Sequence, residues 1–401
     1  MKPVEKREQC CGCGACAQIC PVKCIAMEAD REGFPYPEIT GEVCISCGLC
    51  EKVCPVAGKT AYSGYMGCYT GYAKEDEIRD CSSSGGIFSL LATAILGFGG
   101  VLYGAAADEE QTVRHIRVDS VSGLCLLRGS KYLQSKTENT FSEAKRDLEA
   151  GRYVLYSGTA CQIAGLKQFL MKDYDKLYTV DVLCHGVPSP AVWKKYLEWQ
   201  MRKHGAGSVR QMSFRNKKYG WKRYALQLLF DNGREYLEEH GEDIFLQMFL
   251  ADICLRPSCH ACRFKDLSRM SDLTIGDAWG VDSIDSEMDD DRGTSVILVH
   301  SFKGEKILKE VAAGARMHRA DVEHLLPPWV DSRKSVAVHP GRKCFFMALH
   351  LFGTGIFTLW KLLNIGRRMK KKVKKLLAHR KRPEQFRFSI YRNGQWEERD
   401  R

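Results

Sequence analysis

The chain has 401 residues, of which 44% are hydrophobic and 27% are charged. This is the composition of a globular protein long enough for two or three domains, and it excludes a disordered or low-complexity chain for most of the sequence. The formal net charge of +11 is concentrated in residues 366–382, which hold ten Lys and Arg and no acidic residue, so the remainder carries only +1.

Cysteine is the unusual residue of this chain. There are 19 cysteines, an odd number, and ten of them lie within the first 54 residues. Residues 1–8 contain no apolar stretch of the kind found in secretory signals. We therefore expect a reducing, cytoplasmic compartment, in which thiols held in such numbers bind metal instead of forming disulfides.

Two copies of one cysteine motif open the chain. Each reads C-x2-C-x2-C-x3-C-P, the first beginning at Cys10 and the second at Cys44. This spacing is typical of bacterial two-cluster ferredoxins, in which the fourth cysteine of each run binds the other cluster. Zinc knuckles are the alternative, but they usually use separated C-x2-C pairs. The motif predicts two [4Fe–4S] clusters, one on Cys10, Cys13, Cys16 and Cys54 and the other on Cys44, Cys47, Cys50 and Cys20.

A Ser/Gly stretch at residues 82–86 directly precedes an apolar run at 87–96. We expect a strand within 61–75 and a helix over 87–96. A helix start rich in hydroxyls and free backbone N–H groups can hold a phosphate or pyrophosphate. An ordinary serine cap before a buried helix is the alternative. The dinucleotide fingerprint G-x-G-x-x-G is absent from the sequence.

The middle of the chain alternates predicted strands and helices. Strands are expected at 101–106, 113–118, 153–156 and 177–183, and helices at 141–150, 163–170 and 191–203. This order indicates a parallel α/β unit, in which loops after strands line the ligand crevice. Cys161 and Cys184 fall on two such loops, so we expect them to face each other.

Further thiols follow in the second half of the chain. We expect a hairpin over 209–238 that turns at residues 231–233, a helix over 243–255, strands at 271–280 and 294–300, and a helix over 303–312. The acidic loop at 289–293 reads as a solvated turn, since its spacing does not fit a calcium loop. A third cluster is predicted on Cys161, Cys184, Cys259 and Cys262. Zinc is the alternative metal, and Cys254 is either a replacement ligand or a buried structural cysteine.

Five segments resemble one known family. They are SSSGG at 82–86, SKYLQS at 130–135, GTACQ at 158–162, CHGVPSP at 184–190 and LRPSCHACRFKDLSRMSDLTIGDAWG at 255–280. Over roughly residues 65–340 the chain is similar to the coenzyme F420 hydrogenase/dehydrogenase beta-subunit family, with a two-cluster ferredoxin module in front. One departure is Ala160, which stands where the family's GTxCQ loop usually has proline.

The resemblance implies an α+β or α/β fold. It consists of a bacterial 2[4Fe–4S] ferredoxin-like domain, a mixed α/β flavoprotein domain and a basic helical tail. The expected domains are residues 1–60 for the ferredoxin module, 61–150 for the flavin-phosphate side, 151–335 for the catalytic and cluster region, and 336–401 for the tail. The implied cofactors are [4Fe–4S] clusters, including the third, and FAD. The residues that match the family's motifs, and that we expect near the flavin, are Ser83, Ser84, Gly85, Gly86, Lys131, Gln134 and Asp277.

These features predict an oxidoreductase. Electrons from ferredoxin or a partner subunit would pass through the clusters to FAD and on to a small organic acceptor, which is F420-like or another molecule. His185 is the candidate proton donor, with a purely structural, hydrogen-bonded histidine as its alternative. The competing functions are a non-catalytic relay subunit of a larger redox complex and an iron–sulfur sensor, and the long catalytic-type domain argues against the sensor.

The C-terminal region has an apolar run followed by a basic one. Residues 345–363 are interrupted by Gly353-Thr354-Gly355, which predicts two short helices and no membrane span. Residues 366–382 are expected to form a cationic amphipathic helix that docks on an anionic membrane surface or an acidic partner such as ferredoxin. We expect no nucleic-acid partner, because no reading motif accompanies the charge.

Overall fold

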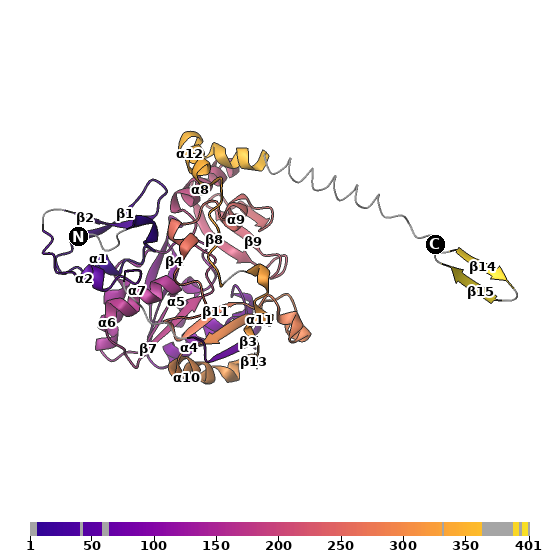
Figure 1. The fold of residues 1–401 in the computed structure, drawn as a ribbon, viewed down its shortest axis with the longest axis horizontal. Helices are drawn as coiled ribbons and strands as arrows, with labels where there is room; N and C mark the ends of the chain where they lie inside the picture. Colours follow the sequence, from indigo (N-terminus) through magenta and orange to yellow (C-terminus); the bar gives the residue numbers. More distant parts are fainter. Residues whose placement is uncertain are drawn as a thin grey trace.

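The computed structural model describes residues 6–40, 43–57, 64–330, 333–362, 388–392 and 395–399. Its centre is an eight-stranded mixed sheet (Figure 1). From one edge to the other the strands are β13 (Ala315–Arg319), β3 (Gly67–Ala73), β12 (Ser295–Val299), β11 (Leu273–Asp277), β7 (Leu177–Val182), β6 (Val154–Thr159), β4 (Val101–Ala107) and β5 (Val113–Val118). Both the 61–150 and the 151–335 ranges contribute strands to it.

The middle of the sheet is parallel and its margins are antiparallel. β4 pairs with β6, β6 with β7 and β7 with β11 in parallel, whereas β5, β12, β3 and β13 join in antiparallel pairs. Parallel strands need a crossover connection, and α7 (Ala160–Leu170) supplies it between β6 and β7. The predicted parallel α/β unit is therefore confirmed.

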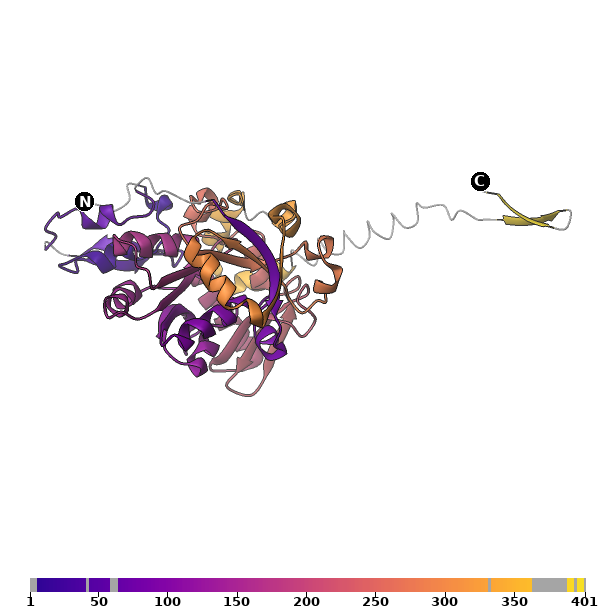
Figure 2. The same cartoon turned by 90° about the horizontal axis from the view of Figure 1, so that it is seen from below.

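Helices cover both faces of this sheet, because neighbouring strand residues point to opposite sides. In β4, Leu102 faces a core formed with α4 (Ile87–Gly97), α5 (Val121–Leu127) and α10 (Phe302–Glu310). Val101 and Tyr103 face a second core formed with α6 (Thr140–Glu149) and α7. The result is a three-layer arrangement in which α7 packs against the N-terminal module (Figures 1 and 2).

A smaller sheet and several helices form a separate hydrophobic core. The sheet is the antiparallel meander β8 (Val209–Asn216), β9 (Ala225–Phe230) and β10 (Glu235–Glu239). Around it lie α8 (Pro190–His204), α9 (Ile244–Leu250) and α12 (Arg342–Phe352). The described part of the chain also contains the short helices α3 (Asp76–Asp80) and α11 (Val322–Leu325), with 3-10 turns at Pro257–Ala261, Val281–Ser283, Ser286–Met288, Ala312–Gly314 and Pro328–Val330.

The N-terminal module is small and packs against the larger sheet domain. It contains a 3-10 turn (Arg7–Gln9), α1 (Ala15–Ile19), the hairpin of β1 (Ile25–Ala29) and β2 (Pro35–Ile39), and α2 (Leu49–Lys52). Cys13 and Ala15 are buried in the same core as α6 and α7. At the other end of the chain, β14 (Phe388–Arg392) and β15 (Gln395–Arg399) form an antiparallel pair.

Several predicted boundaries were wrong. α7 begins at Ala160 and not at 163, because Thr159 and Gln162 form a reciprocal capping box, and Cys161 therefore lies in a helical first turn and not in a loop. α9 ends at Leu250, and Asp252 follows with a left-handed φ of 61°. The 209–238 segment has a third strand in addition to the predicted hairpin.

The predicted split of the apolar C-terminal run is confirmed. α12 ends at Phe352, and residues 355–362 form a second helical segment. None of the helices in the described part of the chain is long and apolar enough to cross a membrane. The predicted cationic helix at 366–382 lies outside the described residues.

Candidate metal and cofactor centres

The first cavity of the N-terminal module is lined by cysteines from both motifs. It has a volume of about 310 Å³ and lies between the loop before α1 and the segment after α2. Burial raises the pKa of the Cys16 thiol to about 12, so in the absence of metal this thiol is protonated at neutral pH. The cysteines at this cavity are Cys10, Cys11, Cys13, Cys16 and Cys54.

The second cavity, of about 380 Å³, has the reciprocal composition. It combines the cysteines of the second motif with the last cysteine of the first motif, namely Cys44, Cys47, Cys50 and Cys20, and it also includes Cys24. Cys44 and Cys47 are exposed, whereas the first cavity has buried cysteines. The fourth cysteine of each run thus lies at the cavity of the other run, in the arrangement that the spacing predicts.

A third set of cysteines gathers at the ends of β6 and β7. Cys161 comes from the first turn of α7, Cys184 from the segment after β7, and Cys259 and Cys262 from the 3-10 turn Pro257–Ala261 and the residue after it. Cys161, Cys184 and Cys262 each act electrostatically on Cys259, so the four thiols are close neighbours. Burial raises the pKa of Cys184 to about 12 and that of Cys262 to about 11.

Cys254 lies elsewhere. Its side chain is fully buried in the hydrophobic core that also contains Trp193 and Phe245. The structure therefore brings Cys161, Cys184, Cys259 and Cys262 together without it.

The donor chemistry of all three sets suits an iron–sulfur cluster, since each brings at least four thiols close together. A tetrahedral zinc ion requires four ligand atoms within about 2.3 Å of a single point. In the described part of the chain no three His, Cys, Asp or Glu side chains converge closely enough to hold a single ion. The two N-terminal cavities, at about 310 and 380 Å³, are lined by five cysteines each.

Two cysteines outside the motifs lie at these sites, and motif spacing alone did not identify them. The Cys24 Sγ is 3.5 Å from the Cys20 Sγ in the second cavity. The Cys11 thiol contacts both Cys13 and Cys161, and hydrogen bonding to Cys13 is the largest contribution that raises the pKa of Cys11. Cys11 therefore links the first cavity to the third cysteine set.

Side chains from the larger domain hold the first cysteine loop through its backbone. Arg256 Nε donates to the carbonyl of Cys10 at 2.8 Å, and Gln134 Nε2 donates to the carbonyl of Cys11 at 3.2 Å. Thr137 Oγ1 donates to the carbonyl of Cys13 at 2.7 Å. Gln134, predicted near a flavin, is therefore placed against the first cysteine loop.

The Ser/Gly loop before α4 lies against the acidic loop 289–293. Ser84 Oγ donates to the carbonyl of Thr294, and the backbone N–H of Gly85 donates to Ser295 Oγ. Gly86 adopts a left-handed φ of 87° and caps α4. These contacts fix the loop beside the paired strands β3 and β12, where Ser295 begins β12.

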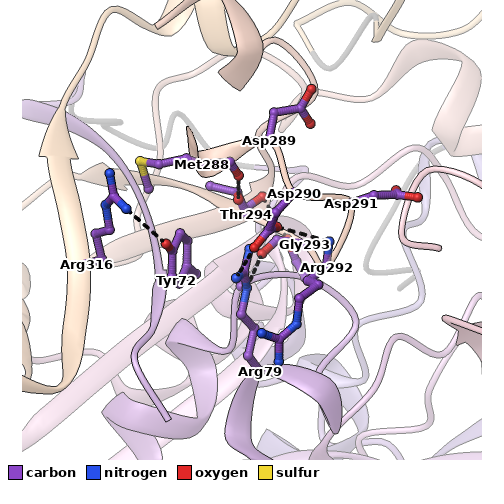
Figure 3. A network of polar contacts seen from close by, with 12 residues as sticks. Tyr72, Arg79, Met288, Asp289, Asp290, Asp291, Arg292, Gly293, Thr294 and Arg316 are labelled. Carbon is purple, nitrogen blue, oxygen red and sulfur yellow. Dashed lines mark hydrogen bonds and ion pairs between the residues drawn. The ribbon is translucent and has the colours of Figure 1, made fainter. Parts of the chain in front are cut away.

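Arg79 fixes the acidic loop (Figure 3). Its guanidinium makes a two-pronged contact with the Asp290 carboxylate at 2.7 and 2.6 Å, donates to the carbonyl of Gly293 at 2.9 Å, and stacks on Tyr72. The loop is therefore held by an arginine, while Asp290 and Asp291 remain exposed, as expected for a solvated turn.

Asp277 is connected to the Ser/Gly loop through Arg215. Arg215 Nη1 lies 2.7 Å from Asp277 Oδ2, and Arg215 Nη2 donates to the carbonyl of Ser83 at 3.4 Å. Lys217 donates to the carbonyl of Ser84, and burial followed by repulsion from Arg215 and Arg79 lowers the Lys217 pKa to about 8. Several cations thus surround the Ser/Gly loop, and this setting suits an anionic group such as a flavin pyrophosphate.

The remaining predicted residues, Lys131 and His185, have local contacts of their own. The backbone N–H of Ser130 donates to Ser83 Oγ, which places the neighbouring Lys131 beside the Ser/Gly loop. Lys131 Nζ donates to the carbonyls of Leu126 and Arg128, and burial lowers its pKa to about 7. His185 Nε2 lies 2.7 Å from Asp252 Oδ1, and its ring packs edge-on against Phe249.

Comparison with known proteins gives two family matches. Residues 151–324 match the family model for the C terminus of the coenzyme F420 hydrogenase/dehydrogenase beta subunit, and residues 9–57 match the 4Fe-4S dicluster domain. No curated protein matches the chain. A solved structure from the F420-reducing [NiFe] hydrogenase complex of Methanosarcina barkeri is similar, with 18% identity and a TM-score of 0.45, covering 77% of this chain and 93% of that one.

Proposed function

The chain belongs to the coenzyme F420 hydrogenase/dehydrogenase beta-subunit family and carries an N-terminal iron–sulfur ferredoxin module, and on this premise we propose that it is an iron–sulfur flavoprotein oxidoreductase. Electrons would enter from ferredoxin or a partner redox subunit and leave on a small organic acceptor. The proposed cofactors are two N-terminal [4Fe–4S] clusters, a third cluster on Cys161, Cys184, Cys259 and Cys262, and FAD.

One observation carries the proposal, namely the direct contact of Cys11 with both Cys13 and Cys161. Cys13 belongs to the first ferredoxin set and Cys161 to the third set. Because these sets adjoin, a redox group on one would lie next to a redox group on the other. A ferredoxin module attached only as a separate domain would have no reason to share a buried thiol contact with the catalytic domain.

When bound, clusters and flavin would supply one-electron transfer and its conversion to two-electron chemistry. The protein's own part is to position and tune these groups. Arg256, Gln134 and Thr137 hold the first cysteine loop, while Arg215 and Lys217 hold the Ser/Gly loop. We assign the pyrophosphate of FAD to the neighbourhood of Ser83, Ser84, Gly85, Gly86 and Lys131, with Asp277 acting there through Arg215.

His185 is the proposed proton donor. It follows Cys184 directly, and its ring nitrogen is held by the Asp252 carboxylate at 2.7 Å. A carboxylate partner fixes the orientation of an imidazole ring and so the direction in which its other nitrogen points. His185→Gln would then lower the rate of acceptor reduction at saturating reductant while leaving iron and flavin contents unchanged.

The central test is the cofactor content of the anaerobically purified full-length chain. We expect about twelve irons per chain, corresponding to three four-iron clusters, together with flavin absorbance. Cys259→Ser should lose about four irons, whereas Cys125→Ser, on the exposed face of α5, should lose none. A wild-type chain that lacks flavin, or that binds zinc at the third set, would contradict the corresponding part of the proposal.

A non-catalytic relay subunit is the second candidate function, and the placement of three cysteine sets in one chain, with Cys44 and Cys47 of the second set exposed, is compatible with it. The two candidates differ in turnover. The reduced, isolated chain should transfer electrons to an organic acceptor if it is an enzyme. A relay would be reoxidised only by its partner subunit.

We also propose a peripheral interaction with an anionic membrane surface. α12 exposes Met347, Leu351 and Phe352 to solvent at 56%, 76% and 62%, and the basic residues 366–382 follow it in the sequence. Exposed apolar side chains beside a cationic run are typical of interfacial segments. The full chain should sediment with anionic vesicles in a salt-sensitive manner, and a chain truncated before Gly366 should not. Equal sedimentation of both would exclude this surface.

A further inference from the structure

Arg256 is fully buried at the junction between the ferredoxin module and the third cysteine set. Its Nε donates to the carbonyl of Cys10 at 2.8 Å, and its two other nitrogens donate to Gln134 Oε1 and to the carbonyl of Pro35, each at 2.9 Å. The guanidinium also lies 4.4 Å from the ring centre of Tyr36. One side chain thus binds three separate segments of the chain.

The three acceptors of Arg256 are all uncharged. The other buried arginines each face a carboxylate, since Arg79 pairs with Asp290, Arg215 with Asp277 and Arg269 with Asp181. In the described part of the chain no carboxylate forms an ion pair with Arg256. An arginine side chain remains charged in proteins, and a buried charge without an opposite charge is costly.

The negative charge that would balance Arg256 is available from the cysteine sets on either side of it. Arg256 binds the carbonyl of Cys10 of the first set, and its backbone carbonyl accepts from the N–H of Cys259 of the third set at 2.9 Å. A four-iron cluster held by four thiolates has a net negative charge, and reduction makes it more negative by one electron.

The backbone of the first cysteine loop allows the Arg256 guanidinium to lie close to the proposed cluster. Gly12 lies between Cys10 and Cys13 with a left-handed φ of +70°, and a Cβ at this position would lie 2.9 Å from Arg256 Nη1. The same Cβ would lie 2.5 Å from Gln134 Nε2, so a side chain here would force Gln134 and Arg256 to shift as well as strain the backbone. The close approach of Arg256 is therefore built into the cysteine motif itself.

Resting on the proposed function above, we propose that Arg256 is a positioning residue that compensates the charge of the first ferredoxin cluster and of the third cluster. By favouring the reduced form of each, it raises both reduction potentials. It also fixes the two centres relative to each other, because its guanidinium binds the carbonyl of Cys10 while its backbone carbonyl accepts from the N–H of Cys259 at 2.9 Å.

Two neighbouring cations provide matched controls. Lys265 Nζ donates to the carbonyls of Cys184 and His185 at 2.6 and 3.0 Å, so it touches only the third set. Arg342 also joins the ferredoxin module to the larger domain, through Glu32 and the carbonyl of Leu255, but its charge is paired with that carboxylate. Arg342→Met therefore tests the loss of a docking contact made by an arginine whose charge, unlike that of Arg256, is already paired with a carboxylate.

The experiment is a redox titration with dithionite, followed by electron paramagnetic resonance on the anaerobic full-length chain. The signal altered by Cys259→Ser identifies the third cluster, and that altered by Cys10→Ser the first. Arg256→Met should lower the potentials of both, each by at least about tenfold in the reduction equilibrium, or 59 mV for one electron. Lys265→Met should lower only the third potential, and Arg342→Met should change neither.

Arg256→Lys and Arg256→Gln separate charge from hydrogen bonding and provide the answer if Arg256→Met does not fold or bind iron. The lysine variant should have reduction potentials close to those of the wild type. The glutamine variant should have the lowered potentials expected for Arg256→Met. Wild-type potentials in the methionine or glutamine variant, with clusters intact, would overturn the role of Arg256. A wild-type chain without clusters would instead contradict the proposed function, and the iron content distinguishes the two failures.

Discussion

The Arg215 guanidinium lies 2.7 Å from the Asp277 carboxylate, and the same guanidinium donates to the backbone carbonyl of Ser83. Asp277 ends β11, whereas Ser83 precedes α4, so this pair joins the end of one strand to the Ser/Gly loop. Trp221 Nε1 also donates to Asp277. This buried ion pair thus adds to the contacts of Ser84 and Gly85 that hold the proposed flavin loop.

Removal of the carboxylate should destabilise the fold, because Arg215 is only 3% exposed and would keep its charge without a partner. We expect Asp277→Ala to lower the free energy of unfolding by ~3 kcal/mol, the usual cost of breaking a buried pair. Chemical denaturation under anaerobic conditions measures this change. Glu239→Ala, which breaks a solvent-exposed pair with Arg223, should change stability far less. Similar losses in the two variants would contradict the structural role of Asp277.

Gly165 on α7 should be essential for the first cluster. A Cβ at this position would lie 2.8 Å from Cys13 Sγ and 2.9 Å from Cys13 Cβ, which is closer than atoms of these types pack. Gly165→Ala should therefore displace Cys13 and reduce bound iron by up to about four atoms per chain. Iron analysis measures the loss. Gly97→Ala in α4 is the control, because nothing lies within 4 Å of its Cβ position, and it should retain all iron.

Much of this architecture could be predicted from local sequence patterns. The two cysteine runs have a spacing that has only one common use, and the strand and helix periods of residues 101–203 indicated the parallel unit. The reciprocal positions of Cys20 and Cys54 also follow from the motif. These features depend on neighbours in sequence or on a repeat, and a single sequence reveals both.

The contacts between distant segments could not be predicted in this way. Arg256 donates to the carbonyl of Cys10, 246 residues away, and a backbone acceptor leaves no trace in the sequence of the cysteine loop. Gln134 was expected near a flavin because its motif matched a family, and that stays a prediction, but its contact with the carbonyl of Cys11 could not be foreseen from the motif. The start of α7 was different, since Thr159 and Gln162 have the spacing of a capping box and could have identified it.

Asp243 should make stability depend on pH. Burial is the main cause that raises its pKa from 3.8 to about 6, against hydrogen bonds from Tyr196, Leu246 and Tyr236. Between about pH 4 and 6 the folded chain therefore binds more protons than the unfolded chain, and stability falls as pH rises through this window. Relative to Asp243→Asn, the free energy of unfolding of the wild type should fall by up to about 3 kcal/mol as the pH rises through this range. It should not fall further above it.

Urea unfolding followed by tryptophan fluorescence from pH 4.5 to 7.5 tests this expectation. Asp119→Asn is the control, because Asp119 is exposed and should leave the wild-type pH profile unchanged. A constant stability difference between the wild type and Asp243→Asn across the range would show that the buried carboxyl titrates normally.

The exchange of the fourth cysteine between the two runs can be tested by substituting that cysteine and measuring how fast the cluster that remains reacts with a reagent in solution. Cys44 and Cys47 are exposed and Cys10, Cys13 and Cys16 are buried, so the second cluster should react with an iron chelator or with oxygen faster than the first. Cys54→Ser should weaken the first cluster and leave the fast-reacting one, although Cys54 belongs to the second run. Decay of the charge-transfer absorbance measures both rates.

Cys20 requires a double substitution, because Cys24 lies 3.5 Å away and could take its place as a ligand. Cys20→Ser with Cys24→Ser should remove the fast-reacting cluster and spare the slow one, although Cys20 belongs to the first run and Cys24 follows it closely. Cys20→Ser alone should retain much of the iron if Cys24 substitutes. Loss of the slow-reacting cluster in the double variant would mean that each run binds its own cluster, and it would contradict the shared cavities of the N-terminal module.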